Sequence, residues 1–478
     1  MEYFMIKKFL INIILCLTVS LMSTLNSSAL TQDQAIEKAN ELNLSESLMW
    51  HRLVHYKDHL FGPFESQADG KKFFLSNKGK KNPKAELIAT IQSFFDKIQN
   101  NDNHGICRFP ARFMWLTEKL NLNESHFKKV HCKKYKEHLN HHQAKSFSLI
   151  FSSYYLNAPA STFGHTLLRI NKSKNPKNLK HFELIDNGIN YAANVSTSNP
   201  ILYALFGLAG VFPGTFSSFP YYYKVREYND NEFRDLWSYN LNLNSKEIKR
   251  VMAHLWELGQ THFDYYYFTE NCSYHVLRLL EVANEKYDFF QDIPFYVAPV
   301  DTIKAVYNTP NLVKSISYRP SSATRFDSAE KNLNKKEKII FYKLVKEKNI
   351  KIIKNKNNKT KAKLLDTYVD YIDFKYATNI LREEGEEWSL RNKILRDRSK
   401  IFENGNQYKI EKPLKKMPHL AHSTERVGLG VYFDKNNNYG EEFAFRFSFH
   451  DLLDPMDGMP PLSKMEMIHV KFRYNNEI

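Results

Sequence analysis

Cys272 has the most distinctive chemical setting in the 478-residue chain, because it directly follows the polar segment Thr269–Asn271. Apolar residues then recur at helical spacing over residues 276–283, which predicts a helix that starts close to Cys272. The unpaired N–H groups and the dipole at a helix N-terminus stabilise a thiolate, and the thiolate is the nucleophilic form of cysteine. The sequence therefore predicts a reactive thiol at Cys272.

Two histidines are candidates for the base and proton donor that thiol catalysis requires. His275 lies one helical turn beyond Cys272 on the same predicted helix, and we interpret it as a packing or supporting residue. His165 opens a strand predicted over Thr166–Ile170. A histidine on a strand that faces a cysteine at a helix start is the arrangement of papain-like enzymes. This arrangement makes His165 the predicted base.

The N-terminus has the three parts of a secretory signal peptide, namely a basic pair at Lys7 and Lys8, the apolar run Phe9–Val19, and small residues at Ser27 and Ala29. The apolar run is short for a full membrane span, although an uncleaved anchor is the alternative. We therefore expect the mature chain to be exported to the periplasm or cell envelope of a bacterium.

The cysteine content also points to Cys272. Of the four cysteines, Cys16 leaves with the predicted signal peptide. Cys107 and Cys132 lie in one N-terminal region and could form a disulfide in an oxidising compartment, although the sequence alone leaves their pairing open. The odd number of cysteines in the mature chain predicts one free thiol, and Cys272 lies far from the other two.

The net charge of +16 does not indicate a nucleic-acid-binding protein. Residues 331–363 hold 13 lysines and two glutamates, so this segment alone accounts for +11. No zinc-finger or aromatic RNA-binding motif accompanies it, and we expect no nucleic-acid partner outside the cytoplasm. We interpret the segment as a solvated helix with a flexible loop. Contact with anionic lipid or cell-wall polymer is the alternative.

The periodicity of apolar residues changes along the chain from helical to strand-like. Helical spacing dominates before residue 147, and a capping box at Asn244 precedes an amphipathic helix. The segment Ile201–Phe212 is apolar and glycine-interrupted, and we expect it to form a loop that walls an apolar site or faces a membrane. Strands are predicted at Phe147–Phe151, Thr166–Ile170, Phe182–Ile185, Arg426–Phe433, Phe443–Phe449 and Met465–Tyr474.

A histidine cluster near the end of the helical region was weighed as a metal site. His138 and His142 would share one face of a helix, but no H-E-x-x-H arrangement with an acidic base is present. We therefore expect a polar helix surface there. The sequence predicts neither a metal site nor a cofactor.

Four motifs of the central region resemble those of a known family. They are Asn157–Arg169, Asn190–Ala193, Tyr222–Asn229 and Phe263–His275. The chain resembles the Lnb N-terminal periplasmic domain, a family named after a bacterial lipoprotein N-acyltransferase. The resemblance spans roughly residues 147–320. Flanking segments, including His55–Lys57 and Cys107–Arg112, are similar to those of proteobacterial members.

The resemblance implies an α+β multidomain protein whose central domain has a permuted papain-like fold of the NlpC type. It has a helical N-terminal domain and a C-terminal antiparallel β region. Cys272 would then be the nucleophile and His165 the base. The residue that orients His165 is either Asp186, expected nearly opposite His165 on a regular hairpin, or Asn190. The expected segments are a signal peptide at 1–29, a helical domain at 30–146, the papain-like domain at 147–320, a lysine-rich helical connector at 321–415 and the β region at 416–478.

The preferred function is acyl transfer through a thioester at Cys272, with an envelope lipid or lipoprotein as substrate. The backbone N–H of Cys272 would supply half of an oxyanion hole, and Asn271, Ser273 and His275 are expected to support the reacting groups. The same fold serves peptidoglycan amidases and endopeptidases, which is the first alternative. A non-catalytic envelope component in contact with the outer membrane is the second.

Overall fold

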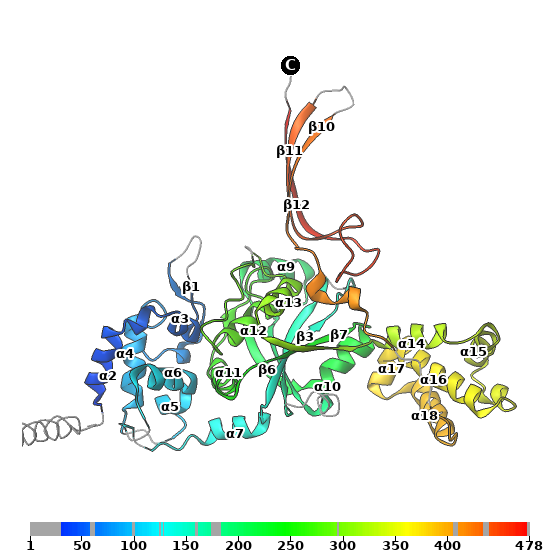
Figure 1. Ribbon diagram of the computed structural model, residues 1–478, viewed down its shortest axis with the longest axis horizontal. Coiled ribbons are helices and arrows are strands. Elements are labelled where there is room, and N and C mark those ends of the chain that lie inside the picture. Colours follow the sequence, from blue (N-terminus) through cyan, green and yellow to red (C-terminus); the bar gives the residue numbers. More distant parts are fainter. Residues whose placement is uncertain are drawn as a thin grey trace, which may run out of the picture.

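The computed structural model describes residues 30–57, 63–97, 101–123, 126–127, 129–157, 161–173, 183–293, 296–404, 410–433 and 439–475. The predicted signal peptide lies outside these residues. The protein has the predicted α+β architecture, built around an antiparallel sheet of seven strands in the order β8-β6-β5-β4-β3-β7-β9 (Figure 1). The strands are β3 (Ser146–Ser152), β4 (His165–Asn171), β5 (Asn187–Ala193), β6 (Pro213–Pro220), β7 (Leu236–Leu241), β8 (Phe263–Asp264) and β9 (Val313–Arg319).

Both faces of the central strands are buried. In β3, Leu149 faces the main apolar core, whereas its neighbour Ile150 belongs to a smaller cluster on the other face. Side chains alternate between the two faces of a strand, so a strand covered on both sides has a continuous apolar sequence. The run Phe147–Phe151 is apolar for this reason. The helices α12 (Cys272–Glu281) and α13 (Pro299–Asn308) pack with the main core, and α10 (Tyr221–Lys224) contributes to the smaller cluster.

Two sequence-based predictions in this region are wrong. The predicted strand Phe182–Ile185 is a short 3-10 helix over Glu183–Ile185, and the next strand, β5, starts only at Asn187. Glu183 is drawn inward by ion pairs with Arg169 and Arg319, at 3.1 and 2.8 Å, which favours a turn over an extended segment. Phe182 lies outside the described residues.

The second correction concerns the segment Ile201–Phe212, which is mostly helical. Helix α9 (Pro200–Ala209) begins after Asn199, whose side chain accepts from two backbone N–H groups, with proline at the first helical position. It ends at Gly210, which has a φ of +73° and lies where a Cβ would meet the ring of Tyr266. No helix among the described residues is both long and apolar enough to cross a membrane.

The N-terminal helices share one continuous core with the central domain. This core includes Trp50, Leu53 and Trp115 together with Val251 of α11 (Ser245–Leu258) and Leu279 of α12. The capping box predicted at Asn244 is present at the start of α11. The N-terminal helices are α2 (Gln32–Glu41), α3 (Leu48–Val54), α4 (Pro83–Phe94), α5 (Gly105–Arg108), α6 (Pro110–Leu120) and α7 (Lys133–His142).

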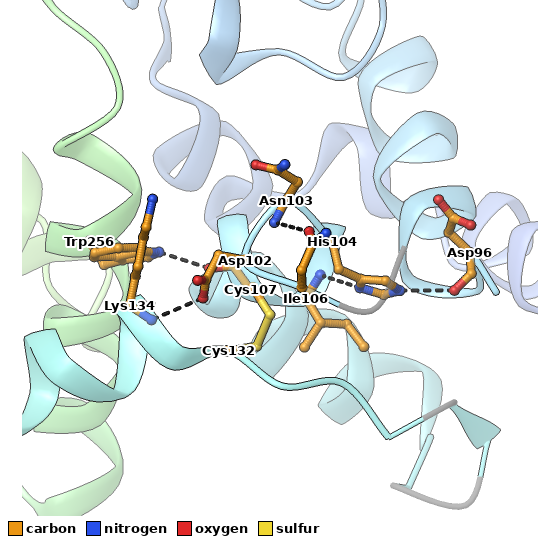
Figure 2. Close-up of a disulfide and its surroundings, with 10 residues drawn as sticks. Asp96, Asp102, Asn103, His104, Ile106, Cys107, Cys132, Lys134 and Trp256 are labelled. Carbon is orange, nitrogen blue, oxygen red and sulfur yellow. Dashed lines mark hydrogen bonds between the residues drawn. A yellow bond between two sulfur atoms is a disulfide. The ribbon is translucent and has the colours of Figure 1, made fainter. Parts of the chain in front are cut away.

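A disulfide between Cys107 and Cys132 links α5 to the start of α7 (Figure 2). The carbonyl of Cys107 accepts a 2.8 Å hydrogen bond from Trp256 Nε1 of α11, and Lys134 N donates to Asp102 Oδ1 at 2.9 Å. The disulfide therefore joins the N-terminal helices at a point where they also contact the central domain. Among the described residues, Cys272 is the one free cysteine.

The lysine-rich segment forms a helical lobe beside the central domain (Figure 1). Its own core includes Phe341, Leu344 and Tyr368, and the lysines lie mainly on its outside. The lobe consists of α14 (Ser322–Lys331), α15 (Lys335–Glu347), α16 (Asn358–Lys375), α17 (Ala377–Arg382) and α18 (Gly385–Ser399). The charge excess is thus carried by a separate structural unit, away from the sheet.

The C-terminal segment forms a three-stranded antiparallel sheet that projects from the central domain (Figure 1). The strands β10 (Arg426–Phe433), β11 (Tyr439–His450) and β12 (Met465–Asn475) occur where the alternation predicted them. The register places Leu429, Phe443 and Phe472 in one row on one face, and all three are exposed. At its base the sheet joins the main core, where Phe447 contacts Phe268 and Tyr296.

Candidate active site

Cys272 is the first residue of α12, as the sequence predicts. The preceding residue, Asn271, caps the helix, because its Oδ1 accepts from the backbone N–H groups of Ser273 and Tyr274 at 3.1 and 3.3 Å. Its Nδ2 donates to the carbonyls of Tyr267 and Val297. Ser273 adds a hydroxyl hydrogen bond to Asn271 Oδ1 at 2.8 Å. Asn271 and Ser273 therefore fix the position of the helix start that carries the thiol.

His165 meets the thiol from the first position of β4. Its Nδ1 lies 3.1 Å from Cys272 Sγ, which is within hydrogen-bond distance for sulfur. Helix α12 packs across β4 and β5, so a residue at the start of β4 reaches the start of the helix. Cys272 and His165 are 107 positions apart in the sequence, and the packing of one helix on one strand brings them together. The geometry allows the S–H group to donate to Nδ1 of a neutral imidazole.

Asn190 of β5 completes a chain of three groups. Its Oδ1 lies 2.9 Å from Nε2 of His165 and can only accept, so it holds the histidine proton on Nε2. This leaves the lone pair of Nδ1 directed at the thiol. The arrangement is that of a nucleophile, a base and a residue that orients the base.

Asp186, the other residue predicted to orient His165, lies at the opposite end of the strands. The register pairs Ile170 with Asn187, so Asp186 falls beside the end of β4 and not beside its first residue. Its Oδ1 accepts from Lys172 N at 3.0 Å, and Arg169 lies 3.7 Å from its other oxygen. The prediction placed Asp186 near His165 because it assumed a hairpin through Phe182–Ile185, and that strand does not form.

His275 is fully buried and does not contact the thiol. Its ring stacks on Tyr191 at 4.0 Å between centroids and lies 4.5 Å from Phe263. Neither ring nitrogen makes a hydrogen bond in the structure. The geometry is that of a packing residue on the buried side of α12.

The protonation state of the thiol differs from the sequence-based expectation. Burial raises the pKa of Cys272 to about 11, even though backbone hydrogen bonds from Thr166 and Ser273 and the charge of Arg234 act in the opposite direction. The helix start does favour the thiolate, but the cost of burying a negative charge is larger. The resting nucleophile is therefore a neutral thiol that needs a base.

His165 is neutral for the same physical reason. Burial lowers its pKa to about 3, the positive charge of Arg234 lowers it further, and the hydrogen bond to Asn190 raises it. Arg234 is itself held by Ser152 O and Ser153 O, at 2.9 and 2.6 Å. A neutral imidazole next to a neutral thiol is ready to accept the proton at neutral pH. Arg234 was not singled out from the sequence, because nothing in its local pattern distinguishes it from other arginines.

The thiol borders a small, partly open hollow at the start of α12. Its walls are mainly aromatic and apolar, and are formed in part by Phe163, Tyr265, Tyr267, Phe268, Tyr296 and Val297. Tyr265 lines the hollow together with Cys272, and burial and the nearby Cys272 sulfur both raise the pKa of its phenol. Sequence analysis missed Tyr265, because it lies in an aromatic run whose members have no separate signal.

Helix α9 lies against the segment that lines this hollow. The carbonyl of Gly207 in α9 accepts from Tyr267 N at 2.8 Å. The helix has no charged residue and no buried residue, and Ile201, Leu205 and Leu208 are between 50 and 71% exposed. A large exposed apolar surface of this kind marks a contact with lipid, an apolar ligand or a partner.

Family comparison places the thiol, the histidine and the asparagine within one known domain. Residues 134–309 match the model of the Lnb N-terminal periplasmic domain. This region is an Lnb N-terminal periplasmic domain. Residues 42–119 and 415–478 match two further models, each described as a domain of unknown function (DUF7843 and DUF7840). No curated protein and no solved structure was matched.

The match to a periplasmic domain supports an envelope protein. The matched range contains β3 to β8, α12 and α13, and so holds every residue of the Cys272–His165–Asn190 chain. Residues before and after it match separately defined models over 42–119 and 415–478, although residues from both ranges pack on the same core.

Proposed function

We propose that this protein is an envelope acyltransferase that carries an acyl group as a thioester on Cys272. The observation that supports this most directly is the hydrogen-bond chain from Cys272 through His165 to Asn190. At its Cys272 end this chain adjoins an apolar hollow. In this proposal the domain is a permuted relative of papain-like thiol enzymes, in which the histidine strand precedes the cysteine helix. The family resemblance to a lipoprotein N-acyltransferase points in the same direction.

The reaction would proceed in two halves. In the first, the sulfur of Cys272 bonds to the carbonyl carbon of an acyl ester while its proton moves to Nδ1 of His165. The oxyanion that forms is stabilised by the N–H of Cys272 and the hydroxyl of Tyr265. The bond to the leaving alcohol then breaks, and the alcohol takes the proton from Nδ1. A thioester and a free alcohol result.

The second half returns the enzyme to its starting state. An amine attacks the thioester carbon and gives a proton to Nδ1 of His165. The carbon–sulfur bond breaks, and the sulfur takes that proton back. The product is an amide, and Cys272 is again a neutral thiol. Water in place of the amine would give hydrolysis by the same steps.

The lining of the hollow favours an acyl chain over a peptide as the group bound. Acyl chains gain free energy from apolar contact at roughly 0.8 kcal/mol per buried CH₂, whereas a peptide or glycan needs polar partners. Phe163, Phe268 and Val297 supply an apolar wall, and the exposed side of α9 extends apolar surface from the same region. An envelope lipid or lipoprotein is the substrate class that fits.

The test is to trap the acyl-enzyme. The mature chain is incubated with vesicles of phosphatidylethanolamine that carry a labelled acyl chain, and the protein is analysed by intact mass. We expect one acyl mass on Cys272, removed by neutral hydroxylamine, and none on Cys272→Ala or His165→Ala. His141→Ala, which changes an exposed histidine on α7, is the matched control and should acylate normally.

Other outcomes would replace the proposal. Cleavage of muropeptides without any acyl mass would indicate a peptidoglycan amidase or endopeptidase. No acyl mass, no cleavage and no reaction of Cys272 with a maleimide or iodoacetamide probe would indicate a non-catalytic envelope component.

A further inference from the structure

Three side chains with metal-binding atoms converge at the base of the C-terminal sheet, away from the thiol. They are His422, His450 and Asp454, and one ligand atom from each lies within 4.8 Å of the others. Within the described parts of the chain, no other set of three such residues meets this spacing. His450 is the last residue of β11, whereas His422 precedes β10 and Asp454 lies in the connection to β12. The fold therefore brings them together from three separate segments.

The orientation of His422 is the one usual for a metal ligand. Its Nδ1 lies 2.7 Å from the carbonyl of Ser423, to which it donates, so the proton is held on Nδ1. The lone pair of Nε2 then points at Nδ1 of His450, 2.9 Å away, with Asp454 Oδ2 at 3.9 Å. A backbone carbonyl that fixes the tautomer and leaves the other nitrogen bare is a regular feature around protein metal ions.

The second histidine can present a lone pair to the same point as His422. His450 is fully buried, and a proton on its Nδ1 can bridge to His422 in the absence of metal. That tautomer leaves Nε2 of His450 as a bare acceptor, and Nε2 is buried without a hydrogen-bond partner. With the proton of His450 on Nε2 instead, Nδ1 of His450 and Nε2 of His422 both offer a lone pair to an ion placed between the rings.

The carboxylate is also held in place. Asp454 Oδ1 pairs with Arg426 at 3.0 Å, and Oδ2 accepts from Asp451 N at 3.0 Å. These contacts fix the direction of the carboxylate toward the histidines before any ion binds. Ligands positioned in advance lower the entropic cost of binding.

We propose that His422, His450 and Asp454 bind a divalent metal ion of the zinc class. Two imidazoles and one carboxylate are a donor set that suits zinc, and three protein ligands leave a fourth position for water. Calcium and magnesium prefer oxygen ligands and are disfavoured by two histidines. This metal site differs from the expectation drawn from the sequence, which weighed only the histidines of α7.

The site is connected to the wall of the hollow. Phe447 lies three residues before His450 in β11 and packs on Phe268 and Tyr296, which line the hollow. Thr424, two residues after His422, donates a hydrogen bond to Asp301 and accepts one from Tyr296. Metal binding would hold both sides of the sheet base against this wall. Its role in the proposal is to position the sheet, and it takes no part in the thiol reaction.

The experiment is a direct metal titration of the full mature chain after dialysis against EDTA. Zinc binding is measured by calorimetry, and cobalt(II) binding by the visible absorption of a four-coordinate site. We expect one equivalent of zinc, with affinity reduced by about 100-fold or more in His422→Ala and in Asp454→Asn. The control His138→Ala, which changes a histidine of α7, should bind zinc as the unaltered protein does.

Each result tests the metal site independently of acyl transfer. No stoichiometric zinc binding by the unaltered chain at micromolar concentration would overturn the proposal. Unchanged affinity in His422→Ala or Asp454→Asn would also overturn it, since the ion would then be bound elsewhere. Circular dichroism of both variants, one of which removes a half-buried ring and one a single charge, separates loss of a ligand from loss of folding.

Discussion

Two buried chains of hydrogen-bonded side chains, each centred on a histidine, lie in the same protein and differ in what they connect. In the first, His165 joins the thiol of Cys272 to Asn190. In the second, His254 Nε2 lies 3.1 Å from His55 Nε2, and His254 Nδ1 lies 3.0 Å from Glu257 Oε2. Burial lowers the pKa of His165 and of His254 to about 3 in each case.

The two hydrogen-bond chains differ in what lies at their ends. Cys272 opens into the aromatic hollow, whereas His55 is enclosed by rings such as Phe73 and Phe263. Burial raises the pKa of Glu257 to about 8, so at neutral pH it is a carboxylic acid that donates to His254. Its other oxygen accepts from the N–H groups of Ala111 and Arg112. In the proposed function only the first of these hydrogen-bond chains takes part in catalysis, because a thiol and a hollow adjoin it.

The largest expected effect is on the rate of Cys272 acylation, and it distinguishes His165 from His254. His165→Ala should lower the rate of Cys272 acylation by about 10³-fold, since a positioned general base contributes about 10²- to 10⁴-fold. His254→Gln should leave that rate unchanged and lower the melting temperature. Acylation is followed by intact mass and melting by differential scanning calorimetry. Equal losses of acylation in both variants would mean that the two chains are functionally linked.

The pH dependence of thiol alkylation tests the charge state of the first chain. With a pKa of about 11 for Cys272 and about 3 for His165, the pair is uncharged between these values. The thiolate fraction then rises about tenfold per pH unit from pH 7 to pH 10, and the rate of reaction with iodoacetamide should rise with it. A rate that is flat over this range would indicate a preformed thiolate–imidazolium pair.

Replacing Asn190 should have a smaller effect. Asn190→Ala removes the acceptor that holds the proton of His165 on Nε2, and a hydrogen bond of roughly 1 kcal/mol corresponds to about a fivefold loss of acylation rate. Asp186→Asn, which changes a carboxylate at the far end of β4 and β5, is the matched control and should not alter the rate. A greater loss in the Asp186 variant would restore that residue as the orienting group.

The effect expected at Glu257 is on stability and not on acylation, and it depends on pH. A carboxyl group with a raised pKa stabilises the folded state below its unfolded pKa, and this contribution is lost as pH rises through about 8. Glu257→Gln stays neutral, can still donate to His254, and should match the unaltered protein within about 1 kcal/mol at pH 5. Relative to the unaltered protein, its free energy of unfolding should increase between pH 5 and pH 8. Urea denaturation at both pH values measures this difference, and an opposite trend would show that Glu257 is ionised in the fold.

The sequence was sufficient to predict that Cys272 and His165 lie together, because each has a local signal. Cys272 follows a polar cap and precedes helical spacing, and His165 opens an apolar strand. The orienting residue was left open between Asn190 and Asp186, because the answer depends on strand register. The register in turn depends on a turn at Glu183–Ile185 that forms through contacts with distant arginines. Such contacts leave no periodic pattern in the sequence.

Properties that arise from burial or from distant contacts could not be predicted from the sequence. The helix start at Cys272 predicts a more acidic thiol, yet burial reverses the sign, and burial depends on what the rest of the chain places around the sulfur. Tyr265 is one of several neighbouring aromatic residues and has no local mark. His422 and His450 are 28 residues apart and meet only because β10 and β11 fold back on each other.

The single core that runs through the N-terminal helices and the central sheet has a consequence for how this chain can be divided. Residues as far apart as Ala35 and Met465 belong to it, whereas the Lnb N-terminal periplasmic domain is matched only over residues 134–309. A fragment cut at those boundaries would expose the face of α11 that packs on α6 and would lose both cysteines of the disulfide. The thiol-bearing domain is therefore not a portable module in this protein. Recombination or truncation that preserves it must carry its neighbours with it.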